Sequence, residues 1–380
     1  MIKFIFLIEF EKKAMKKRLV FVLSLLLSLV INSQENNSLL WKISGNGLEK
    51  DSYLYGTMHV SQKIAFHLDD VFYESLLKSD FVALESDPSF WLDNMFESNT
   101  LARTFGGLNS YGRSFYTNSF KLDSPKLEQL MFFISREDML MNGILYRTNN
   151  YSQNFQEDTY LDMFIYQTGK KYGKKIFSLE DLERSRILVQ RAQVDAMKTK
   201  PDVWLQKKMK KENYFSLLSN SYRDRNIQFI DSLNKGMYKE NYLKNMLYIR
   251  NEEMANNIDS IARKGSLFSG IGAAHLAGEK GVISMLRKKG YTVTPYTSKE
   301  SKVAKDSKSK IENKFLKIDY KQDFSSDKFF SAKLPNKLYE LNMLNNTIYL
   351  SPDLANGSYV VITRINTFSY LKKDENFENK

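Results

Sequence analysis

The chain has 380 residues, of which 42% are hydrophobic and 13% aromatic, enough for one large domain or two small ones with a real core. It contains no cysteine, which excludes disulfides, thiolate metal sites, a cysteine nucleophile and a lipid anchor on cysteine. The formal net charge is +12, but we recognise no basic stripe with interleaved aromatic residues on one element. Nucleic-acid binding is therefore not predicted.

The N-terminus has the pattern of an export signal. Basic residues at 16–18 precede an apolar run at 19–31, which polar residues then end. The run is shorter than the roughly 20 residues that cross a bilayer, so a cleaved signal peptide at residues 1–34 is favoured over a membrane helix or a buried N-terminal helix. Met15 would be a natural start for such a signal, so we expect residues 1–14 to be an upstream misreading of the start codon. We expect an exported protein, periplasmic or secreted, without a stable membrane anchor.

The first folded stretch is rich in strands. Short apolar runs at Leu39–Ser44 and Tyr53–Gly56 predict two strands, separated by a turn at Gly45–Gly47. Apolar residues at helical spacing predict a helix from about Leu68 to Ser79. A buried strand is predicted at Phe81–Leu84, directly before Glu85.

The middle of the chain is mostly helical. Residues 88–150 are irregular in pattern, and we expect short helices and loops that cover a site. A helix is predicted at Gln156–Tyr172, which Gly173 ends, and a strand at Lys175–Leu179. A long helical region follows from Leu182 to about Arg263. We expect it to be interrupted near Pro201 and near Ser219-Asn220.

The clearest unit in the pattern comes next. A strand at Leu267–Ile271, a helix at Glu279–Lys289 and a strand at Tyr291–Pro295 make a βαβ pattern, which implies at least one parallel strand pair. Residues 35–296 are therefore predicted to form one α/β domain. Its expected architecture is a mixed central sheet with flanking helices and a helical lid region.

The last part of the chain differs in composition. Residues 297–314 are charged and poor in apolar residues, which predicts a linker. Residues 315–380 are expected to form a small β-rich appendage. The predicted features of this tail are strands at Phe329–Ala332 and Tyr359–Ile365, and turns at Pro352 and Asn356-Gly357.

Two of the three histidines close the same four-residue pattern, Gly56-Thr57-Met58-His59 and Gly272-Ala273-Ala274-His275. Each follows a predicted strand, and the glycine is expected to let the chain turn sharply there. Glu85 also ends a strand, so all three side chains are expected at the carboxyl edge of the sheet, where ligands bind in α/β folds. Imidazole and carboxylate groups can bind a metal ion or act as a general base with its partner. The alternative is that both histidines are structural residues at turns, and His67 is expected only to start a helix.

Three separated blocks, LLWKISGNGLEKDSYLYGTMHV, FVALESD and GIGAAHLAGEKGVISMLRKKGYTVTPY, occur in an order that resembles the TraB/GumN family. This family includes the Tiki metalloproteases and is similar in fold to erythromycin esterase-like and ChaN-like proteins. The resemblance runs from about Leu39 to Tyr296. It implies an α/β core and an active site with paired GxxH motifs and an acidic residue. His59, Glu85 and His275 carry over as catalytic residues and as metal ligands.

Four further positions match less distinctive blocks of the same family. Asp162 lies in a YLD segment, Glu180 in SLE, and Arg250 and Asn251 in IRNEEM. The resemblance implies catalytic roles for Glu180 and Arg250 and substrate-binding roles for Asp162 and Asn251. Arg250 would neutralise an anionic intermediate or pair with a site carboxylate, while its alternative is a surface ion pair.

The function that this pattern predicts best is a metal-dependent hydrolase, in particular a peptidase, with a divalent ion such as Mn, Co or Zn. The substrate class is a peptide or another small molecule. The resemblance leaves two alternatives open. One is a metal-free hydrolase of the erythromycin esterase type, with a histidine base and Glu85 as its partner. The other is a periplasmic protein that binds a metal complex or haem.

Overall fold

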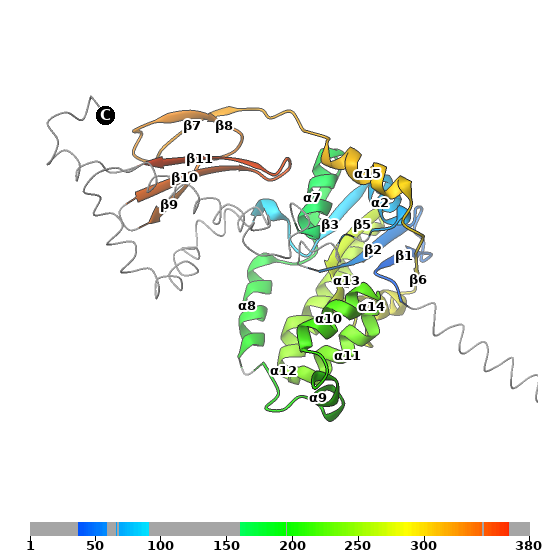
Figure 1. Cartoon of the computed structure of the whole chain (residues 1–380). Helices are drawn as coiled ribbons and strands as arrows, with labels where there is room; N and C mark the ends of the chain where they lie inside the picture. The colour runs from blue at the N-terminus through cyan, green and yellow to red at the C-terminus, as the bar shows by residue number, and fades with distance from the viewer. Residues whose placement is uncertain are drawn as a thin grey trace, which may run out of the picture.

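The computed structural model describes residues 37–58, 66, 68–90, 160–194, 196–343 and 346–364. These residues form an α/β body and a smaller β part beside it, next to helix α7 (Figure 1). The predicted signal peptide, His59, His67 and most of the irregular stretch 88–150 lie outside the described residues.

The body is built on a six-stranded mixed sheet with the strand order β4-β3-β5-β2-β1-β6. Strands β4, β3, β5 and β2 are parallel, and β1 runs antiparallel to both β2 and β6. The predicted mixed α/β fold is confirmed, and the predicted strand ends differ by at most one residue. The strands are β1 Leu40–Ser44, β2 Ser52–Thr57, β3 Phe81–Leu84, β4 Lys175–Ser178, β5 Leu267–Gly272 and β6 Thr292–Pro295.

The predicted βαβ unit is present, but its two strands are not neighbours. Strand β6 runs in the same direction as β5 but pairs with β1 at the sheet edge, so β2 and β1 lie between β5 and β6. The parallel pairs that the pattern implied are formed instead among the central strands. Every residue of β2 is buried, as expected of a strand covered on both faces.

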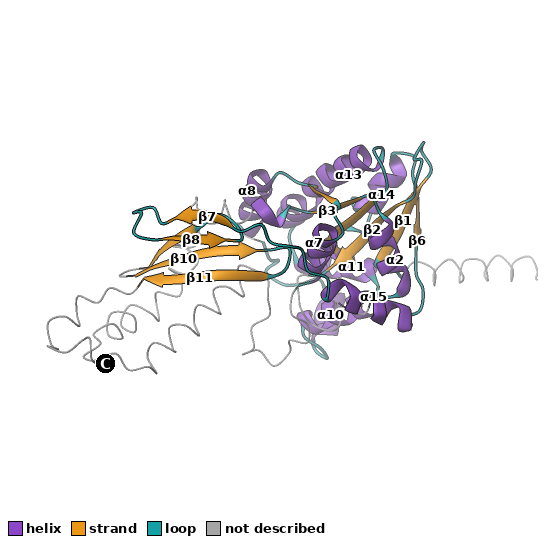
Figure 2. Ribbon diagram, turned by 90° about the horizontal axis from the view of Figure 1, so that it is seen from above, coloured by secondary structure: helices purple, strands orange, loops and turns teal. Residues whose placement is uncertain are grey.

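Helices cover both faces of this sheet. Figure 2 shows α2, α7 and α15 on one face and α13 and α14 on the other. None of the helices in the described part of the chain is long and apolar enough to span a membrane. The helical elements are α2 Asp70–Lys78, α7 Leu161–Lys171, α8 Leu182–Gln193, α9 Val203–Met209, α10 Tyr214–Arg223, α11 Ile227–Met237, α12 Glu240–Leu243, the π-helix η2 Lys244–Tyr248, α13 Ile249–Ala262, the 3₁₀-helix η3 Ala273–His275, α14 Val282–Lys288 and α15 Lys302–Glu312.

One of the two predicted helix interruptions is wrong. The break near Pro201 is confirmed, but Ser219-Asn220 lies inside α10. The chain breaks a few residues later, where Arg225 adopts a φ of 55° and the Asn226 side chain caps α11. Within α10 the Asn220 amide donates to the Glu212 carboxylate, so this polar side chain is satisfied without ending the helix.

The charged segment 297–314 was predicted as a linker, yet most of it is helix α15. Ser301 caps this helix by accepting from the Val303 amide at 3.0 Å. Ala304 and Ile311, seven residues apart and therefore on one face, are both buried. The Lys171 ammonium also donates to the Ile311 carbonyl at 3.1 Å. Two apolar residues at helical spacing, together with hydrogen bonds from the start of α15 to Asp70, thus dock a helix whose overall composition is that of a linker.

The tail forms two small antiparallel sheets. Strands β7 Lys321–Phe324 and β8 Ser331–Leu334 make one, and β9 Tyr339–Met343, β10 Asn346–Asp353 and β11 Ser358–Arg364 make the other. Buried residues Leu350 and Leu354 belong to the same apolar core as the body, and the Gln167 amide on α7 donates to the Leu354 carbonyl at 3.1 Å. The β part is therefore packed against the body.

The predicted turn at Asn356-Gly357 is confirmed, with Gly357 at a φ of 67°. The predicted turn at Pro352 is wrong, because this residue lies in β10 opposite Tyr359. The pairing of β10 with β9 ends at Leu350. Pro352 has no amide hydrogen to donate, but no residue of β9 pairs with it, so no hydrogen bond between strands is lost on the β9 side.

We predict that Ile311→Ala lowers the free energy of unfolding by about 2–4 kcal/mol, because it leaves a cavity where α15 packs on the body. Val303→Ala, on the exposed side of the same helix, serves as the matched control and is expected to cost less than about 0.5 kcal/mol. Urea denaturation measures both. Equal values for the two variants would show that α15 does not dock.

Candidate active site

The carboxyl ends of the four parallel strands bring several predicted residues to one edge of the sheet. Glu85 directly follows β3, and Glu180 lies two residues beyond β4. His275 ends the 3₁₀-helix η3 that follows β5, and Arg250 is the second residue of α13. Hydrogen bonds and ion pairs join these four side chains. The expectation of a shared edge therefore holds for Glu85 and His275, the two of its three residues that the structure describes.

The Arg250 guanidinium lies between two carboxylates. Its Nε donates to Glu180 Oε1 at 2.9 Å, and its Nη2 donates to Glu85 Oε2 at 2.8 Å and to Glu180 Oε2 at 3.0 Å. Its Nη1 donates to the Met246 carbonyl at 3.1 Å. The side chain of Arg250 is 9% exposed and that of Glu180 is 3% exposed. Arg250 thus pairs with carboxylates of the candidate site, and the alternative of a surface ion pair is wrong because the guanidinium is buried. These contacts fix the ends of β3 and β4 to the start of α13.

Burial and charge act against each other in this cluster. Burial raises the pKa of the Glu180 carboxyl above its usual range, against the attraction of Arg250. Burial would lower the pKa of Arg250, but the charges of Glu85 and Glu180 outweigh it and raise that pKa. Arg250 thus stays charged. With both carboxylates ionised the three groups carry a net charge of −1, which favours a further positive charge nearby.

His275 is held by Asn251 in a defined orientation. The His275 Nδ1 lies 2.6 Å from Asn251 Oδ1, and Asn251 Nδ2 donates to the Lys280 carbonyl at 2.8 Å. Because the amide nitrogen is used by Lys280, its oxygen faces the imidazole, and Nδ1 must carry the proton. In the neutral ring Nε2 is then an acceptor. It lies 3.7 Å from Glu85 Oε1, to which the Gly272 amide also donates at 2.7 Å.

The glycines of the two GxxH motifs are required for a different reason than the predicted sharp turn. A Cβ atom at Gly56 would lie 2.6 Å from Leu276 Cδ1 and 3.2 Å from Ala273. At Gly272, which has a φ of −53°, it would lie 3.1 Å from Glu85 Oε1. Neither backbone needs a left-handed conformation. The glycines instead allow the strand ends to approach one another and the carboxylate closely.

The predicted substrate-binding residues make structural contacts in the described part of the chain. The Thr57 hydroxyl, in the first GxxH motif, donates to Asp162 Oδ1 at 2.7 Å. Asp162 thereby joins the start of α7 to the end of β2. Asn251 contacts His275, as described above. The position of His59 relative to Glu85 and His275 stays a prediction, since His59 lies outside the described residues.

We call the four joined side chains of Glu85, Glu180, Arg250 and His275 the carboxylate cluster. Ser185, which the sequence did not predict as a site residue, also belongs to it. Its hydroxyl donates to Glu180 Oε2 and accepts from Arg250 Nε, the latter at 3.2 Å. Ser185 lies in the first turns of α8, whose cap is Asp181. In the sequence, Ser185 lies five residues after Glu180. A helix that starts at residue 182 turns the Ser185 side chain back toward the Glu180 carboxylate.

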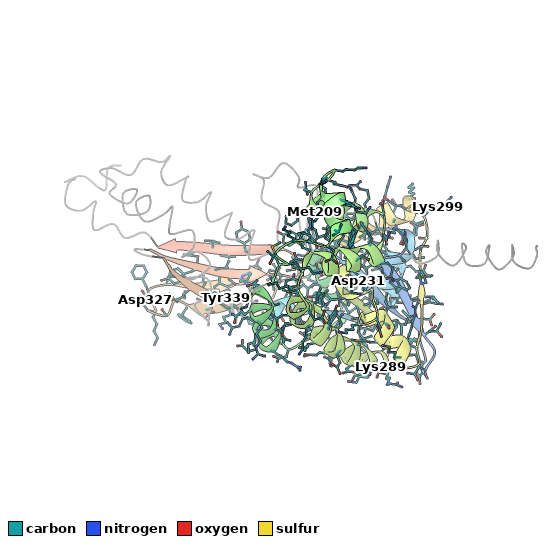
Figure 3. The ribbon with its side chains drawn as sticks, turned by 90° about the horizontal axis from the view of Figure 1, so that it is seen from below. Met209, Asp231, Lys289, Lys299, Asp327 and Tyr339 are labelled. Atoms are coloured by element: carbon teal, nitrogen blue, oxygen red, sulfur yellow. The ribbon has the colours of Figure 1, made fainter. Side chains whose placement is uncertain are left out.

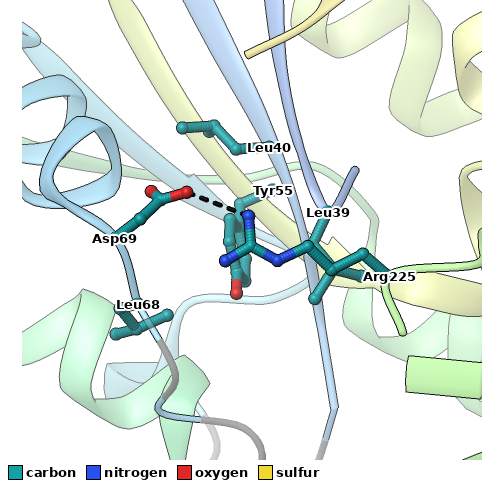
Figure 4. A pocket seen from close by; sticks show the side chains of 6 residues that line it. All are labelled: Leu39, Leu40, Tyr55, Leu68, Asp69 and Arg225. Carbon is teal, nitrogen blue, oxygen red and sulfur yellow. Dashed lines mark hydrogen bonds and ion pairs between the residues drawn. The ribbon is translucent and has the colours of Figure 1, made fainter. Parts of the chain in front are cut away.

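A second missed group supports the end of β2. The buried Tyr222 hydroxyl on α10 donates to the Gly56 carbonyl at 3.0 Å. Burial raises the pKa of Tyr222, so this hydroxyl keeps its proton and remains a donor. Nearby, Arg225 and Asp69 form an ion pair of 2.9 Å (Figure 4). They line a cavity of about 10 Å³ together with Tyr55, room for about one water molecule.

A comparison with models of protein families gives a match to the TraB/PrgY/gumN family over residues 39–295. The chain belongs to this family. The match includes all six strands of the sheet and every residue of the carboxylate cluster, whereas α15 and the β part lie outside it. Comparisons with curated proteins and with solved structures gave no match.

We predict that Arg250→Met lowers the free energy of unfolding by about 3–5 kcal/mol, because it leaves the buried Glu180 carboxylate and the half-buried Glu85 carboxylate without their cation. The matched control is Arg186→Met, which removes an exposed ion pair with Glu183 and is expected to cost less than about 1 kcal/mol. Denaturant unfolding at neutral pH provides the measurement. Adding Glu180→Gln to Arg250→Met is expected to restore part of the loss. A loss for Arg250→Met no larger than the control's would contradict the buried ion pair.

Proposed function

We propose that this TraB/PrgY/gumN family member is a metal-dependent hydrolase, in which His275, Glu85 and His59 hold a divalent ion. The observation that carries the proposal is the orientation of His275. Its Nδ1 proton is directed to Asn251, and its Nε2 is left as an acceptor 3.7 Å from Glu85 Oε1. A neutral imidazole whose other nitrogen is hydrogen-bonded is the usual form of a histidine metal ligand.

The chemistry and spacing of these two side chains fit such an ion. Two ligand atoms that each lie about 2.0–2.2 Å from one ion can be separated by the 3.7 Å found between Nε2 and Oε1. Each ligand is also oriented by its own partners. Asn251 holds His275, while the Gly272 amide and Arg250 hold the two oxygens of Glu85. His59 is assigned as the third ligand from its motif and family resemblance alone.

The chemistry that the ion would supply is a bound water with its pKa lowered toward about 7 and a polarised carbonyl. The protein's own groups have separable tasks. His275 presents Nε2, and Glu85 presents Oε1 and keeps Oε2 on Arg250. Arg250 was expected to neutralise an anionic intermediate or to pair with a carboxylate. Since Nε, Nη1 and Nη2 all donate to protein acceptors, pairing is the role that the contacts support.

A metal-free hydrolase is the second candidate, and one observation favours it. Arg250 already supplies a positive charge 2.8 Å from Glu85 Oε2, which weakens the attraction of that carboxylate for a further cation. In that case His275 Nε2 would act as the general base, with Asn251 fixing the ring and Glu85 stabilising the imidazolium that forms. Metal binding distinguishes the two candidates.

Substrate and location are proposed from the sequence. We propose a peptide substrate on the basis of the resemblance to the Tiki metalloproteases. Export is proposed because basic residues at 16–18 precede the apolar run at 19–31. The protein would then act in the periplasm or outside the cell.

We predict that the mature chain from Glu35 binds about one Mn²⁺, Co²⁺ or Zn²⁺ ion and cleaves peptides only when the ion is present. His275→Ala and Glu85→Gln are expected to lose both properties, because each removes a ligand, while His67→Ala serves as the matched histidine control and keeps them. The metal content is measured after dialysis, and peptide cleavage is measured before and after chelation of the metal. Peptide cleavage that survives complete removal of metal would transfer the assignment to the metal-free hydrolase.

We predict that Asn251→Leu lowers metal affinity about 10–100-fold, because the Nδ1 proton of His275 loses its acceptor. Asn257→Leu is the matched control, since Asn257 lies on the same helix and donates to the Leu179 carbonyl. Calorimetric titration with Zn²⁺ measures both variants. Equal affinities for Asn251→Leu and wild type would contradict the role of Asn251 in orienting the ligand.

A further inference from the structure

A group of apolar side chains is exposed around helix α9. Val194, Met197, Val203 and Phe215 have exposed fractions of 58–76%, and Trp204 is 36% exposed. They come from the end of α8, the segment that follows it, α9 and the start of α10. Helix α9 lies at an outer end of the helical region, far from the β part, and Figure 3 shows Met209 at that margin of the molecule. We call this region the α9 surface.

The same region is strongly basic. Residues 196–215 contain six lysines and two acidic residues, a net charge of +4. Of these lysines, the exposed ones are Lys200, Lys207, Lys208, Lys210 and Lys211. Both acidic residues are already engaged, since Asp202 pairs with Lys198 at 2.7 Å and Glu212 accepts from Asn220. The exposed lysines therefore face solvent without a balancing carboxylate from residues 196–215.

The geometry of α9 interleaves the two kinds of side chain. Val203 and Lys207 are four residues apart and share one side of the helix, as do Trp204 and Lys208. Leu205 points to the opposite side and is fully buried. The outward side thus presents apolar groups at the level of the backbone and ammonium groups on long flexible stems, the arrangement of a helix that lies in a membrane interface.

We propose that the α9 surface binds the surface of a membrane that contains anionic phospholipid. The lysines complement the negative headgroups, and the exposed Val203 and Phe215 insert beside them among the acyl chains. A second copy of this surface is a poor partner, because two faces of net charge +4 would repel each other. Outward-facing aliphatic groups such as Val194 and Met197 also fit acyl chains better than the phosphates and bases of a nucleic acid.

Such binding would be peripheral and reversible, and it is separate from the proposed hydrolysis. The α9 surface contains none of the residues of the carboxylate cluster. The members of the α9 surface come from several elements, so no single element carries a basic stripe with aromatic residues that would predict this surface from the sequence. Only their packing around Leu205, Leu217 and Leu233 brings them together.

The test is sedimentation of the full 380-residue chain with vesicles of phosphatidylglycerol and phosphatidylcholine in equal parts, compared with phosphatidylcholine alone. Two variants test the charged and the apolar side chains of the α9 surface separately. The first replaces Lys207, Lys208, Lys210 and Lys211 by Gln, and the second combines Val203→Ser with Phe215→Ser. The charge-matched control replaces four exposed lysines by Gln, at positions 314 and 317 between α15 and β7 and at positions 321 and 333 in β7 and β8. The apolar run at 19–31 is common to all chains.

We expect wild type and control to bind the anionic vesicles equally and the phosphatidylcholine vesicles weakly. The lysine variant is expected to lose about a hundredfold in affinity, and the apolar variant about tenfold, with unchanged thermal unfolding for both. The proposal is overturned if both α9 variants bind as the control does. It is equally overturned if the wild type binds a 20-base-pair DNA duplex but not the anionic vesicles.

Discussion

The buried guanidinium of Arg250 is the constraint around which the candidate site is organised. It bonds to carboxylates that follow two different strands, Glu85 after β3 and Glu180 after β4, and it is itself carried by α13. These two carboxylates, one buried and one half-buried, lie at the ends of adjacent parallel strands and would repel each other without a cation between them. Arg250 therefore makes it possible for one oxygen of Glu85 to face His275 while the other is held in place.

The close approach of strand ends has a similar dependence on small residues. Gly272 brings its own amide to Glu85 Oε1, and a side chain at this position would press against that oxygen. Gly56 allows β2 to lie against the segment that carries His275. The two GxxH motifs thus serve two purposes, because their glycines allow close packing and their last residues are the histidines. They let imidazole and carboxylate groups meet at one edge of a parallel sheet.

The parts outside the family match are attached to this body by specific contacts. Helix α15 docks through Ala304 and Ile311, and the β part contributes Leu350 and Leu354 to the same core. On the helical side, α9 places lysines and apolar groups on an outer surface. A hydrolytic site at the sheet edge and a membrane-binding surface on the helices would use separate regions of the same molecule.

The sequence by itself determined the mixed α/β class, the six strands of the sheet, and the residues Glu85, Glu180, Arg250 and His275 that meet at its edge. The class, the strands, Glu85 and His275 follow from local patterns, because strand periodicity and a glycine after a strand are read within a few residues. Glu180 and Arg250 were implied by the family resemblance. Only the tertiary structure decided that Asn251 fixes the proton on His275, that Ser185 joins the carboxylates, and that α15 is a docked helix. Those outcomes depend on which side chains from distant segments come within hydrogen-bonding or packing distance, and no local pattern encodes that distance.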